Sequence, residues 1–424
     1  FWISAYTIHF GLVVYSLVCM IGFMTGLEIP LIMRINQTYE SLRENISSVM
    51  EYDYYGGLLG GALFAFVLLP FLGLTYTPVV IGSLNLLVAS LVLWHFSNYL
   101  TRPRTLNIQF TVLLIISVLA FSVAKPIVLY GEQHKYKDKI IYQEQTRYQK
   151  IVVTQWKDNF WLFINGSTQF STYDEERYHE PLVHPVMGLL KEQKDILLLG
   201  AGDGLAAREI LKYPGVESLT LVDLDPAMTR LARQHEMFLR VNQGSLNDPR
   251  VRVHNKDAYQ FIKESSDLYD AIIIDLPDPK SVSLSLLYSL GFYKMIEKHL
   301  KPFGAMVTQS TSPLYSPEAF LCIKKTMQAA NFSTLPYQNS VPSMGQWGWV
   351  LGIREKTMPA NRLKKEVIAQ ESSGIETRFF NQNAMISMAN FGKGLFEKEE
   401  KIEPNTQFNH NILKYYRQGS WDLY

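Results

Sequence analysis

The chain has 424 residues, enough for two or three domains, and a formal net charge of +1, which supplies no electrostatic argument for nucleic-acid binding. Hydrophobic residues make up 47% of it, yet residues 1–130 are largely apolar and poor in charge, whereas the remainder has the composition of a soluble α/β enzyme. Its two cysteines, Cys19 and Cys322, lie far apart and predict neither a disulfide framework nor a structural zinc site. Because the first residue is Phe1, we expect upstream sequence to be missing.

Four apolar stretches occupy the first third of the chain, at residues 5–26, 56–74, 79–96 and 110–130. Each is about long enough to cross a bilayer, which takes ~20 helical residues. We expect Glu28 and Pro30 to end the first stretch, a polar loop to precede the second, and a turn at residues 75–78 to follow it. Four such stretches in sequence are not expected of a soluble protein, so residues 1–130 are predicted to form a multi-pass α-helical membrane domain.

Charge does not settle which side of the membrane carries the rest of the chain. The loops after the first and third stretches are basic, and the positive-inside rule places them in the cytoplasm. Four full crossings would then put the remaining residues on the opposite side. The fourth stretch is itself followed by Lys135, Lys137 and Lys139, which conflicts with that topology unless this stretch, interrupted at Lys125-Pro126, does not cross fully. The arginines of the loops after the first and third stretches are Arg34, Arg43, Arg102 and Arg104.

Residues 131–190 predict a linker and a small β-hairpin domain. Alternating apolar residues at 148–154 and 160–164 indicate strands, and Asn165-Gly166 is a strong hairpin-turn signal. An acidic cluster at 174–180 follows, with Tyr178 and His179 inside it. Two interpretations stay open for that pair, a packed core pair behind a helix or part of a site. The neighbouring carboxylates would ordinarily form a solvated face.

Residues 196–225 predict a nucleoside-binding βαβ unit. A continuous apolar run at 196–199 is typical of a buried strand; a glycine turn at 200–204 and a helix at 205–211 follow. The next strand ends in Asp223, in the position of a ribose-binding carboxylate. Asp203, an acid inside the turn, would repel a pyrophosphate at the helix N-terminus and therefore favours a cationic nucleoside such as a sulfonium. The alternative is that Asp203 only caps the helix.

Four acids each follow a predicted strand. Because ligands of doubly wound sheets bind at the carboxyl ends of the strands, we expect these acids to meet at one rim. A cluster of like charges is unfavourable unless a cation compensates it. No His, Cys, Asp or Glu spacing here is typical of a metal site, so a polycationic substrate is the simplest compensation. The acids are Asp203, Asp223, Asp257 and Asp275.

Several separately placed motifs, in order along residues 145–352, resemble the spermidine synthase (polyamine aminopropyltransferase) family. The apolar N-terminal third resembles its membrane-anchored bacterial branch, as do residues 26–30 and 345–349. Several motifs in the right order are more specific evidence than one glycine loop. The motifs that carry the resemblance are Tyr148-Gln149, Asn165-Gly166 with Gln169, Asp174-Glu175 with Tyr178-His179-Glu180, Gly200-Ala201-Gly202-Asp203-Gly204 with Arg208-Glu209, Asp257-Ala258, and Asp275 with Asp278-Pro279.

The resemblance implies a Rossmann-like, class I methyltransferase-type domain at 191–355, preceded by the small β-domain and followed by a C-terminal helical extension at 356–424. It implies aminopropyl transfer from decarboxylated S-adenosylmethionine, a co-substrate and not a bound cofactor, to a polyamine such as putrescine, which yields spermidine and 5′-methylthioadenosine. The implied partners are a small polyamine and the lipid bilayer, with no nucleic acid and no metal, and a homo-oligomer stays open. Donor availability favours the cytoplasmic side of the cell membrane.

The resemblance also implies residue roles. For the donor, Gln149, His179 and Asp203 would contact the methionine-derived part, Asp223 the ribose, and Asp257 with Ala258 the adenine, with Gly200 and Gly202 in the turn. Tyr178, Asp275 and Asp278 would face the acceptor. A base must take a proton from the attacking amine, and we expect Asp275 to do so, with Tyr178 orienting the amine.

Two departures from the family pattern lie on the acceptor side and leave the acceptor open. Residues 280–283 read Lys-Ser-Val-Ser where the family usually has Gly-Pro, and Val341 stands where a tyrosine is frequent. Two other functions are weighed beside aminopropyl transfer. One is methyl transfer from S-adenosylmethionine, which Asp203 disfavours, and the other is a non-catalytic polyamine-sensing or transport-coupled membrane protein.

Overall fold

The computed structural model describes residues 2–37, 41–96, 103–370 and 374–421. The chain divides into two compact units, Phe1–Lys135 and Tyr136–Tyr424.

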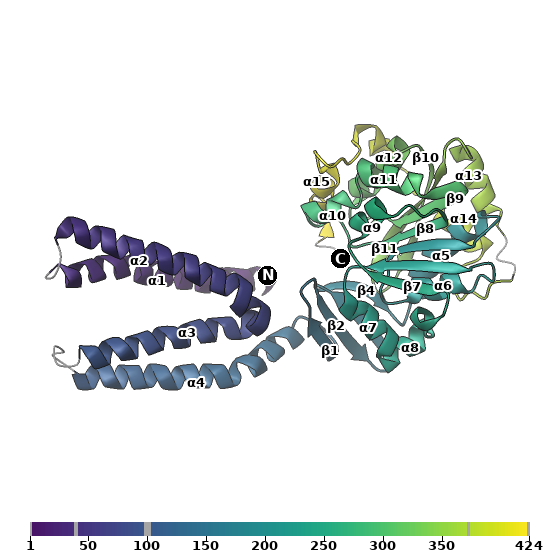
Figure 1. Ribbon diagram of the computed structural model, residues 1–424. Helices are drawn as coiled ribbons and strands as arrows, with labels where there is room; N and C mark the ends of the chain where they lie inside the picture. The colour runs from purple at the N-terminus through teal and green to yellow at the C-terminus, as the bar shows by residue number, and fades with distance from the viewer. Residues whose placement is uncertain (1, 38–40, 97–102, 371–373, 422–424) are drawn as a thin grey trace. The chain divides into compact units, whose positions relative to one another are not determined.

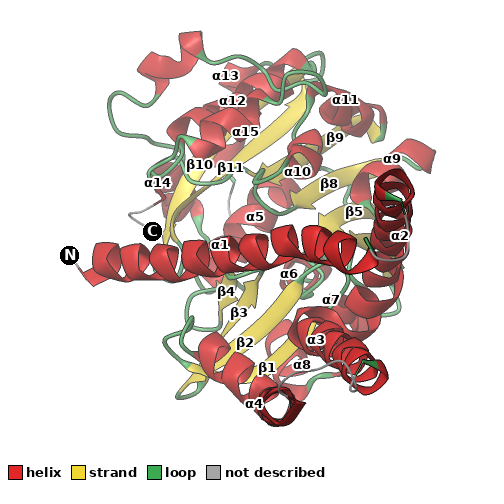
Figure 2. Cartoon of the chain, turned by 90° about the vertical axis from the view of Figure 1, so that its left-hand side faces the viewer, coloured by secondary structure: helices red, strands yellow, loops and turns green. Residues whose placement is uncertain are grey.

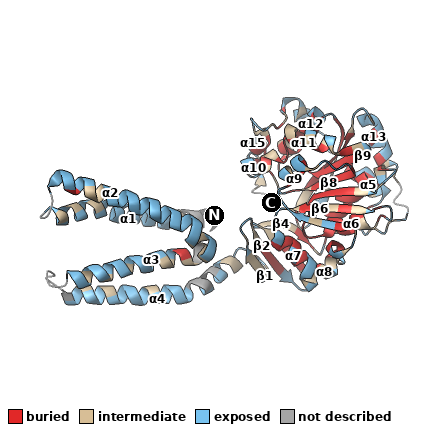
Figure 3. Cartoon of the chain, viewed as in Figure 1, coloured by how far each residue is buried: buried red, intermediate tan, exposed pale blue. Residues whose placement is uncertain are grey.

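The N-terminal unit consists of long helices, drawn from purple to blue in Figure 1. Four segments of these helices are long and apolar enough to cross a membrane, and their apolar side chains are almost entirely exposed (Figure 3). The helices are α1 (Trp2–Asn36), α2 (Leu42–Leu63), the π-helical η1 (Phe64–Leu68), α3 (Leu69–His95) and α4 (Pro103–Gln133).

The first two helices extend further than the sequence predicts. α1 continues through Glu28 and Pro30, so these residues do not end it. From Leu42 on, the polar segment expected as a loop is instead the start of α2, because Ser41 and Glu44 form a capping box at the N-terminus of that helix; residues 38–40 lie outside the described residues. Hydropathy marks only the apolar part of a helix, whereas hydrogen bonding decides where it begins.

The break between the second and third stretches is also displaced from its predicted place. Residues 75–78 are helical, and the backbone leaves helical geometry at Gly73, where φ is 64°. A positive φ of this kind is open to glycine without steric penalty. Thr77 donates its hydroxyl to the Gly73 carbonyl oxygen at 2.6 Å and so satisfies an acceptor next to the break. α4 passes through Pro126 without interruption.

The C-terminal unit begins with a four-stranded antiparallel sheet in the order β1-β2-β3-β4. Asn165 and Gly166, both with positive φ, form the turn between β3 and β4, which confirms the predicted hairpin turn. The sequence missed β1, whose residues are only partly buried and carry no clear alternation. The strands are β1 (Lys139–Gln145), β2 (Lys150–Trp156), β3 (Asn159–Ile164) and β4 (Ser167–Ser171).

A mixed seven-stranded sheet follows, in the order β10-β11-β9-β8-β5-β6-β7. The five strands from β9 to β7 in that order are parallel, and β11 and β10 are antiparallel to their neighbours. This is the predicted Rossmann-like arrangement. The strands are β5 (Asp195–Gly200), β6 (Ser218–Asp223), β7 (Val251–Asn255), β8 (Tyr269–Asp275), β9 (Leu300–Gln309), β10 (Phe332–Val341) and β11 (Gly345–Arg354).

Helices cover both faces of this sheet (Figure 2), and the alternation of each strand divides the core in two. In β5, Ile196 and Leu198 face one layer and Leu197 and Leu199 the other, and all four are fully buried. Each such side chain contributes roughly 1.5–3 kcal/mol to folding, which is why the run is continuously apolar.

The first layer packs α5 (Glu176–Leu189), α6 (Leu205–Leu211), α7 (Pro226–Gln234), α8 (Glu236–Asn242), α13 (Ala360–Ile368) and α14 (Gln382–Met388). The second packs α9 (Ala258–Glu264), α11 (Leu290–Lys298), α12 (Pro317–Ala329) and α15 (Asn411–Arg417). The shorter helical segments are η3 (Ser245–Asn247), α10 (Val282–Leu286) and η4 (Phe396–Lys401).

Candidate active site

The carboxyl ends of three adjacent parallel strands, β8, β5 and β6, meet at one edge of the large sheet. Gly200 at the end of β5 lies opposite Asp275 at the end of β8, and Leu199 lies opposite Val222, so Asp223 follows directly on the other side. This is the edge at which doubly wound sheets bind ligands. The strand register therefore brings the glycine turn and two of the predicted acids together.

The glycine turn holds Asp223 and Asp203 in different ways. The backbone N–H of Gly202 donates to Asp223 Oδ2 at 3.0 Å, and a Cβ at position 202 would stand 2.5 Å from that oxygen. Glycine is thus required there by close approach. Asp203 Oδ1 accepts a hydrogen bond from the backbone N–H of Leu205 at 2.8 Å, although the N-cap residue of α6 is Gly204, so Asp203 is not the N-cap that the alternative interpretation expected. The charge of His179 lowers the pKa of Asp203, against the larger effect of burial.

Tyr178 and His179 lie in the first turn of α5, and both are almost fully buried. The Tyr178 hydroxyl donates to Asp275 Oδ1 at 2.6 Å, while its ring packs against Trp349. His179 Nδ1 faces two acceptors of Glu175, the carbonyl oxygen at 2.9 Å and the carboxylate at 3.2 Å. Nδ1 therefore carries a proton, which leaves Nε2 as the variable position of the ring. Tyr178 and His179 are therefore both buried in the core and in contact with the acid cluster.

Burial dominates the electrostatics of the acids. It raises the pKa of Asp275 and that of Asp223 to about 6, and it raises the pKa of Asp203 and of Asp278 above the ordinary range. The charge of His179 opposes this effect at Asp203 and Asp275. Burial therefore disfavours the ionised form of all four carboxylates, and a cationic ligand would compensate the solvation that they have lost. In the described ranges no three His, Cys, Asp or Glu side chains are grouped as metal ligands.

Asp278, in the loop after β8, receives hydrogen bonds from distant parts of the chain. The Tyr416 hydroxyl on α15 donates to Asp278 Oδ2 at 2.9 Å, and Gln309 Nε2 on β9 donates to Oδ1 at 3.3 Å. The sequence analysis missed both residues. Tyr416 follows Asp278 by 138 residues, and no motif joins the two, so only the packing of α15 reveals the contact.

A buried ionic network lies behind His179. Glu175 pairs with Arg208 at 2.9 Å, Arg208 with Glu209 at 2.8 Å, and Glu209 with His184 at 2.9 Å. Burial disfavours the ionised form of Glu175, but its hydrogen bonds and ion pairs with His179 and Arg208 outweigh burial and lower its pKa to about 2. The expectation of a solvated acidic face at 174–180 is therefore wrong for Glu175, because Arg208 compensates its charge inside the protein.

Glu180, in the same acidic cluster, anchors the C-terminal extension. Its buried carboxylate accepts backbone N–H groups of Arg378, Phe379 and Phe380 at 2.7–2.8 Å. Asp174 is buried too, and it accepts from the backbone N–H and the hydroxyl of Ser343. Glu180 and Asp174 therefore bind other segments of the chain, whereas Glu175 holds His179.

The remaining donor residues lie around the end of β6. Gln149 belongs to a turn whose Thr146 hydroxyl donates to Asp225 Oδ2 at 2.8 Å, which ties the turn to the loop after β6. Asp257 is exposed and caps α9 by accepting from the Gln260 N–H, and Ala258 is buried in the first turn of that helix. No hydrogen bond among the described residues joins Asp257 to the other acids. The roles of these residues stay predictions.

The two departures on the acceptor side have distinct structural consequences. Lys280 reaches from the loop after β8 to the small sheet, where its ammonium donates to the Ser167 hydroxyl at 2.7 Å. Its charge lowers the pKa of Asp278, against the larger effect of burial. Val341 ends β10 and is 1% exposed in the first core layer, so it contributes packing.

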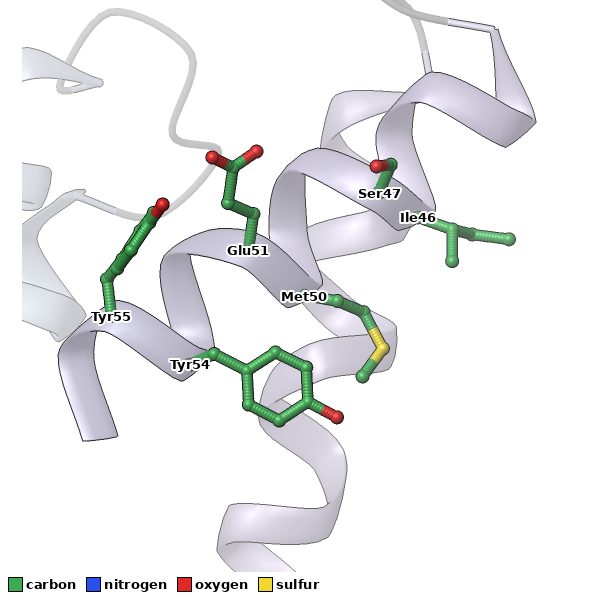
Figure 4. A pocket seen from close by; sticks show the side chains of 6 residues that line it. All are labelled: Ile46, Ser47, Met50, Glu51, Tyr54 and Tyr55. Carbon is green, nitrogen blue, oxygen red and sulfur yellow. The ribbon is translucent and has the colours of Figure 1, made fainter. Parts of the chain in front are cut away.

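A hollow of about 500 Å³ lies on α2 of the N-terminal unit (Figure 4). It is open, and Glu51 is the one acid among its lining residues. A single exposed carboxylate lacks the converging charges of the sheet edge, so the candidate site is the cluster around Asp275. The lining residues are Ile46, Ser47, Met50, Glu51, Tyr54 and Tyr55.

Comparison with known proteins yields one consistent family. The Spermine/spermidine synthase domain matches residues 175–365, a range that ends before the segment carrying Tyr416. A polyamine aminopropyltransferase of Oceanobacillus iheyensis is 37% identical over 413 residues, 97% of this chain and 79% of that protein. Polyamine aminopropyltransferase 2 of Aquifex aeolicus is 39% identical over 411 residues, 96% of this chain and 80% of that protein. Coverage this high requires that the matches include most of the N-terminal apolar unit.

Solved structures show the same fold. A spermidine synthase of Thermotoga maritima superimposes with a TM-score of 0.54 at 24% identity, covering 62% of this chain and 88% of that one. A spermidine synthase in complex with the transition-state analogue AdoDATO gives a TM-score of 0.55 at 24% identity, with 62% and 89% covered.

Proposed function

The chain belongs to the spermine/spermidine synthase family of polyamine aminopropyltransferases, and we propose that putrescine is its acceptor and Asp275 its catalytic base. It is an aminopropyltransferase that uses decarboxylated S-adenosylmethionine as co-substrate and needs no further cofactor. The single observation that carries the residue assignment is the hydrogen bond of 2.6 Å between Tyr178 and Asp275. The acids around this pair are Asp203, Asp223 and Asp278.

The donor side selects for positive charge. Decarboxylation leaves the transferred three-carbon chain with a terminal ammonium and no carboxylate, so the donor can approach Asp203 favourably. Ordinary S-adenosylmethionine would bring its own carboxylate toward that side chain, and the repulsion disfavours it. His179 lies in a fixed orientation beside this carboxylate, because its Nδ1 proton is engaged by Glu175. Asp223 takes the ribose hydroxyls and residues 257–258 contact the adenine.

The acceptor side deprotonates the nucleophile. Putrescine carries a positive charge at each end at neutral pH, since alkylammonium groups have pKa values near ~10.4. Asp278 holds one end, and Asp275 accepts the proton from the other end. The Tyr178 hydroxyl keeps the Asp275 carboxylate in one orientation while this happens.

The transfer is an in-line displacement. The neutral amine nitrogen attacks the carbon next to the sulfonium, the carbon–sulfur bond breaks, and its electron pair stays on sulfur. 5′-Methylthioadenosine leaves as a neutral molecule, and the new secondary amine leaves as its ammonium, so the one proton released is the proton that Asp275 took before the attack. Because both substrates are held by charges on one rim, much of the acceleration comes from alignment.

We further propose that the N-terminal unit is inserted in the cell membrane and that the catalytic unit faces the cytoplasm, where the donor is available. The support is the set of four helical segments long and apolar enough to cross a bilayer. The prediction is that the protein stays in the pelleted membranes after alkaline carbonate washing and is released by detergent. Release by carbonate alone would refute insertion.

The experiment that tests the function incubates detergent-purified protein with decarboxylated S-adenosylmethionine and, separately, putrescine, cadaverine or spermidine. We expect 5′-methylthioadenosine and the aminopropylated amine in equal amounts, with putrescine used at the highest kcat/KM. A higher kcat/KM for spermidine would refute the assignment of the acceptor. A methylated product from ordinary S-adenosylmethionine would refute the assignment of the donor.

A further inference from the structure

The C-terminal helix α15 forms part of the surroundings of an acceptor carboxylate. Tyr416 is only 6% exposed, and its hydroxyl donates to Asp278 Oδ2. A hydroxyl binds an ionised carboxylate more strongly than a neutral carboxyl, so this hydrogen bond of 2.9 Å lowers the pKa of Asp278, against the larger effect of burial. α15 therefore contacts the predicted substrate-binding acid directly.

Buried contacts fix α15 next to the loop that carries Asp278. Asn405 is fully buried, and its side-chain amide donates to the carbonyl oxygens of Ser285 at 2.8 Å and Tyr288 at 3.1 Å. The side-chain oxygen of Asn405, Oδ1, accepts from the backbone N–H of Ile412 at 3.3 Å, and Ile412 lies in the first turn of α15. The segment 282–288 directly follows the acceptor loop, so the start of α15 is bonded to the same stretch of chain.

The ring of Tyr416 packs against the ring of Trp421. The two ring centroids are 4.6 Å apart, and the Trp421 Nε1–H donates to the Tyr416 carbonyl oxygen at 2.8 Å. A side chain restrained in this way gives its hydroxyl one direction, which lowers the entropy lost when the hydrogen bond forms.

Neutral side chains donate hydrogen bonds to Asp278. Tyr416 and Gln309 stabilise the ionised carboxylate without cancelling its charge, and Thr311 acts in the same direction, whereas the charge of Lys280 offsets part of that charge. With donors on both oxygens, the orientation of the carboxylate is restrained. With Asp278 and Asp275 both held in place, the distance between them would select a diamine of matching length.

We propose that Tyr416 is a positioning residue for the acceptor, acting through Asp278, and that the C-terminal segment around α15 is a functional wall of the acceptor pocket. This inference rests on the proposed role of Asp278 in acceptor binding. It assigns to residues 405–421 a part in acceptor affinity that the catalytic-domain motifs do not contain.

The test compares Tyr416→Phe with Tyr415→Phe in the full-length, detergent-purified enzyme. The control removes the neighbouring hydroxyl on the same helix, which accepts from the Glu403 N–H and does not face Asp278. We expect Y416F to raise the KM for putrescine by about 10-fold, the loss of one hydrogen bond to a charged group, and to leave kcat and the donor KM within about twofold of wild type. Y415F should leave the KM for putrescine unchanged.

The pH profile supplies a readout that a merely structural role would not move. Lys280, Tyr288 and Tyr178 are the other titratable groups that interact with Asp278. Without the Tyr416 hydrogen bond the pKa of Asp278 rises, so the acidic limb of kcat/KM for putrescine should move to higher pH in Y416F alone.

The outcomes separate this inference from the proposed function. Wild-type enzyme that forms 5′-methylthioadenosine with putrescine establishes the reaction independently of either variant. If that enzyme is active and Y416F keeps the wild-type KM for putrescine, the inference is overturned. It is also overturned if Y416F lowers the melting temperature and changes the donor and acceptor KM values equally, because the role would then be structural.

Discussion

Replacing Asp275 by asparagine tests the proposed base with little change of shape. Asparagine has nearly the same volume, and its carbonyl oxygen can still accept the hydroxyl of Tyr178, which now donates to Asp275 Oδ1 at 2.6 Å. The amide cannot accept a proton. The substitution therefore removes proton transfer while the packing around residue 178 is retained.

The magnitude follows from the position of Asp275. Burial raises the pKa of its carboxyl to about 6. Moving a proton from an alkylammonium group of pKa ~10.4 to such a carboxyl costs roughly 6 kcal/mol, against roughly 9 kcal/mol for a solvent-exposed aspartate of pKa ~3.9. Without Asp275 the proton must go to water or to a less well-placed group, and we expect kcat to fall by about 10²- to 10⁴-fold.

The assay measures 5′-methylthioadenosine release between pH 5 and 9. Activity of the wild type should rise with pH through about 6, because the base must be ionised. Asp223 titrates in the same range and the pKa values of Asp203 and Asp278 are also raised, so the limb reports on the acid cluster as a whole. In D275N the pH dependence of kcat that comes from Asp275 should disappear, whereas the pH dependence of the donor KM that comes from Asp223 should remain. Asp248→Asn, which alters a surface ion pair with Arg250, should behave as wild type. A D275N enzyme with a kcat within about threefold of wild type would refute the reasoning.

Three further substitutions probe the donor site and the C-terminal anchor. Asp203→Asn should raise the donor KM by about 10-fold and reduce the preference for the decarboxylated donor, measured as the ratio of the affinities for the two sulfonium compounds; an unchanged ratio would contradict the charge argument. Gly202→Ala would place a Cβ 2.5 Å from Asp223 Oδ2, so donor affinity by calorimetry should fall at least about 10-fold, and wild-type affinity would show that Asp223 is not needed. Glu180→Gln removes a buried charge that accepts three backbone N–H groups and should destabilise the catalytic unit by about 2 kcal/mol in denaturant unfolding, whereas exposed Glu217→Gln should have no effect.

The sequence alone determined the parts of this protein that depend on local pattern. The continuous run 196–199 predicted a strand buried on both faces, and parallel topology followed from the βαβ order. Asn165-Gly166 predicted its hairpin turn because few other residues adopt that backbone conformation. Since all parallel strands end at the same edge, the sequence predicted that Asp203, Asp223, Asp257 and Asp275 would meet there. Strand register brings Asp223 and Asp275 to the glycine turn that carries Asp203, whereas Asp257 is exposed and caps α9.

Helix boundaries were predicted less well in the N-terminal unit. Hydropathy placed the ends of the spans at Glu28, Pro30 and residues 75–78, whereas α1 continues past the first two and the break lies at Gly73. A helix in this unit ends where its hydrogen bonds cannot continue, and apolar composition does not encode that point.

Only the tertiary structure decided which charged groups are compensated inside the protein. Glu175 and Glu180 belong to what the sequence presents as an ordinary acidic surface, yet one meets Arg208 and the other the backbone of residues 378–380. Tyr416 reaches Asp278 across 138 residues in the same way. Pattern along the chain records which groups need a partner, but the partner of a buried charge is set by which distant segments pack together, and that is a property of the folded core.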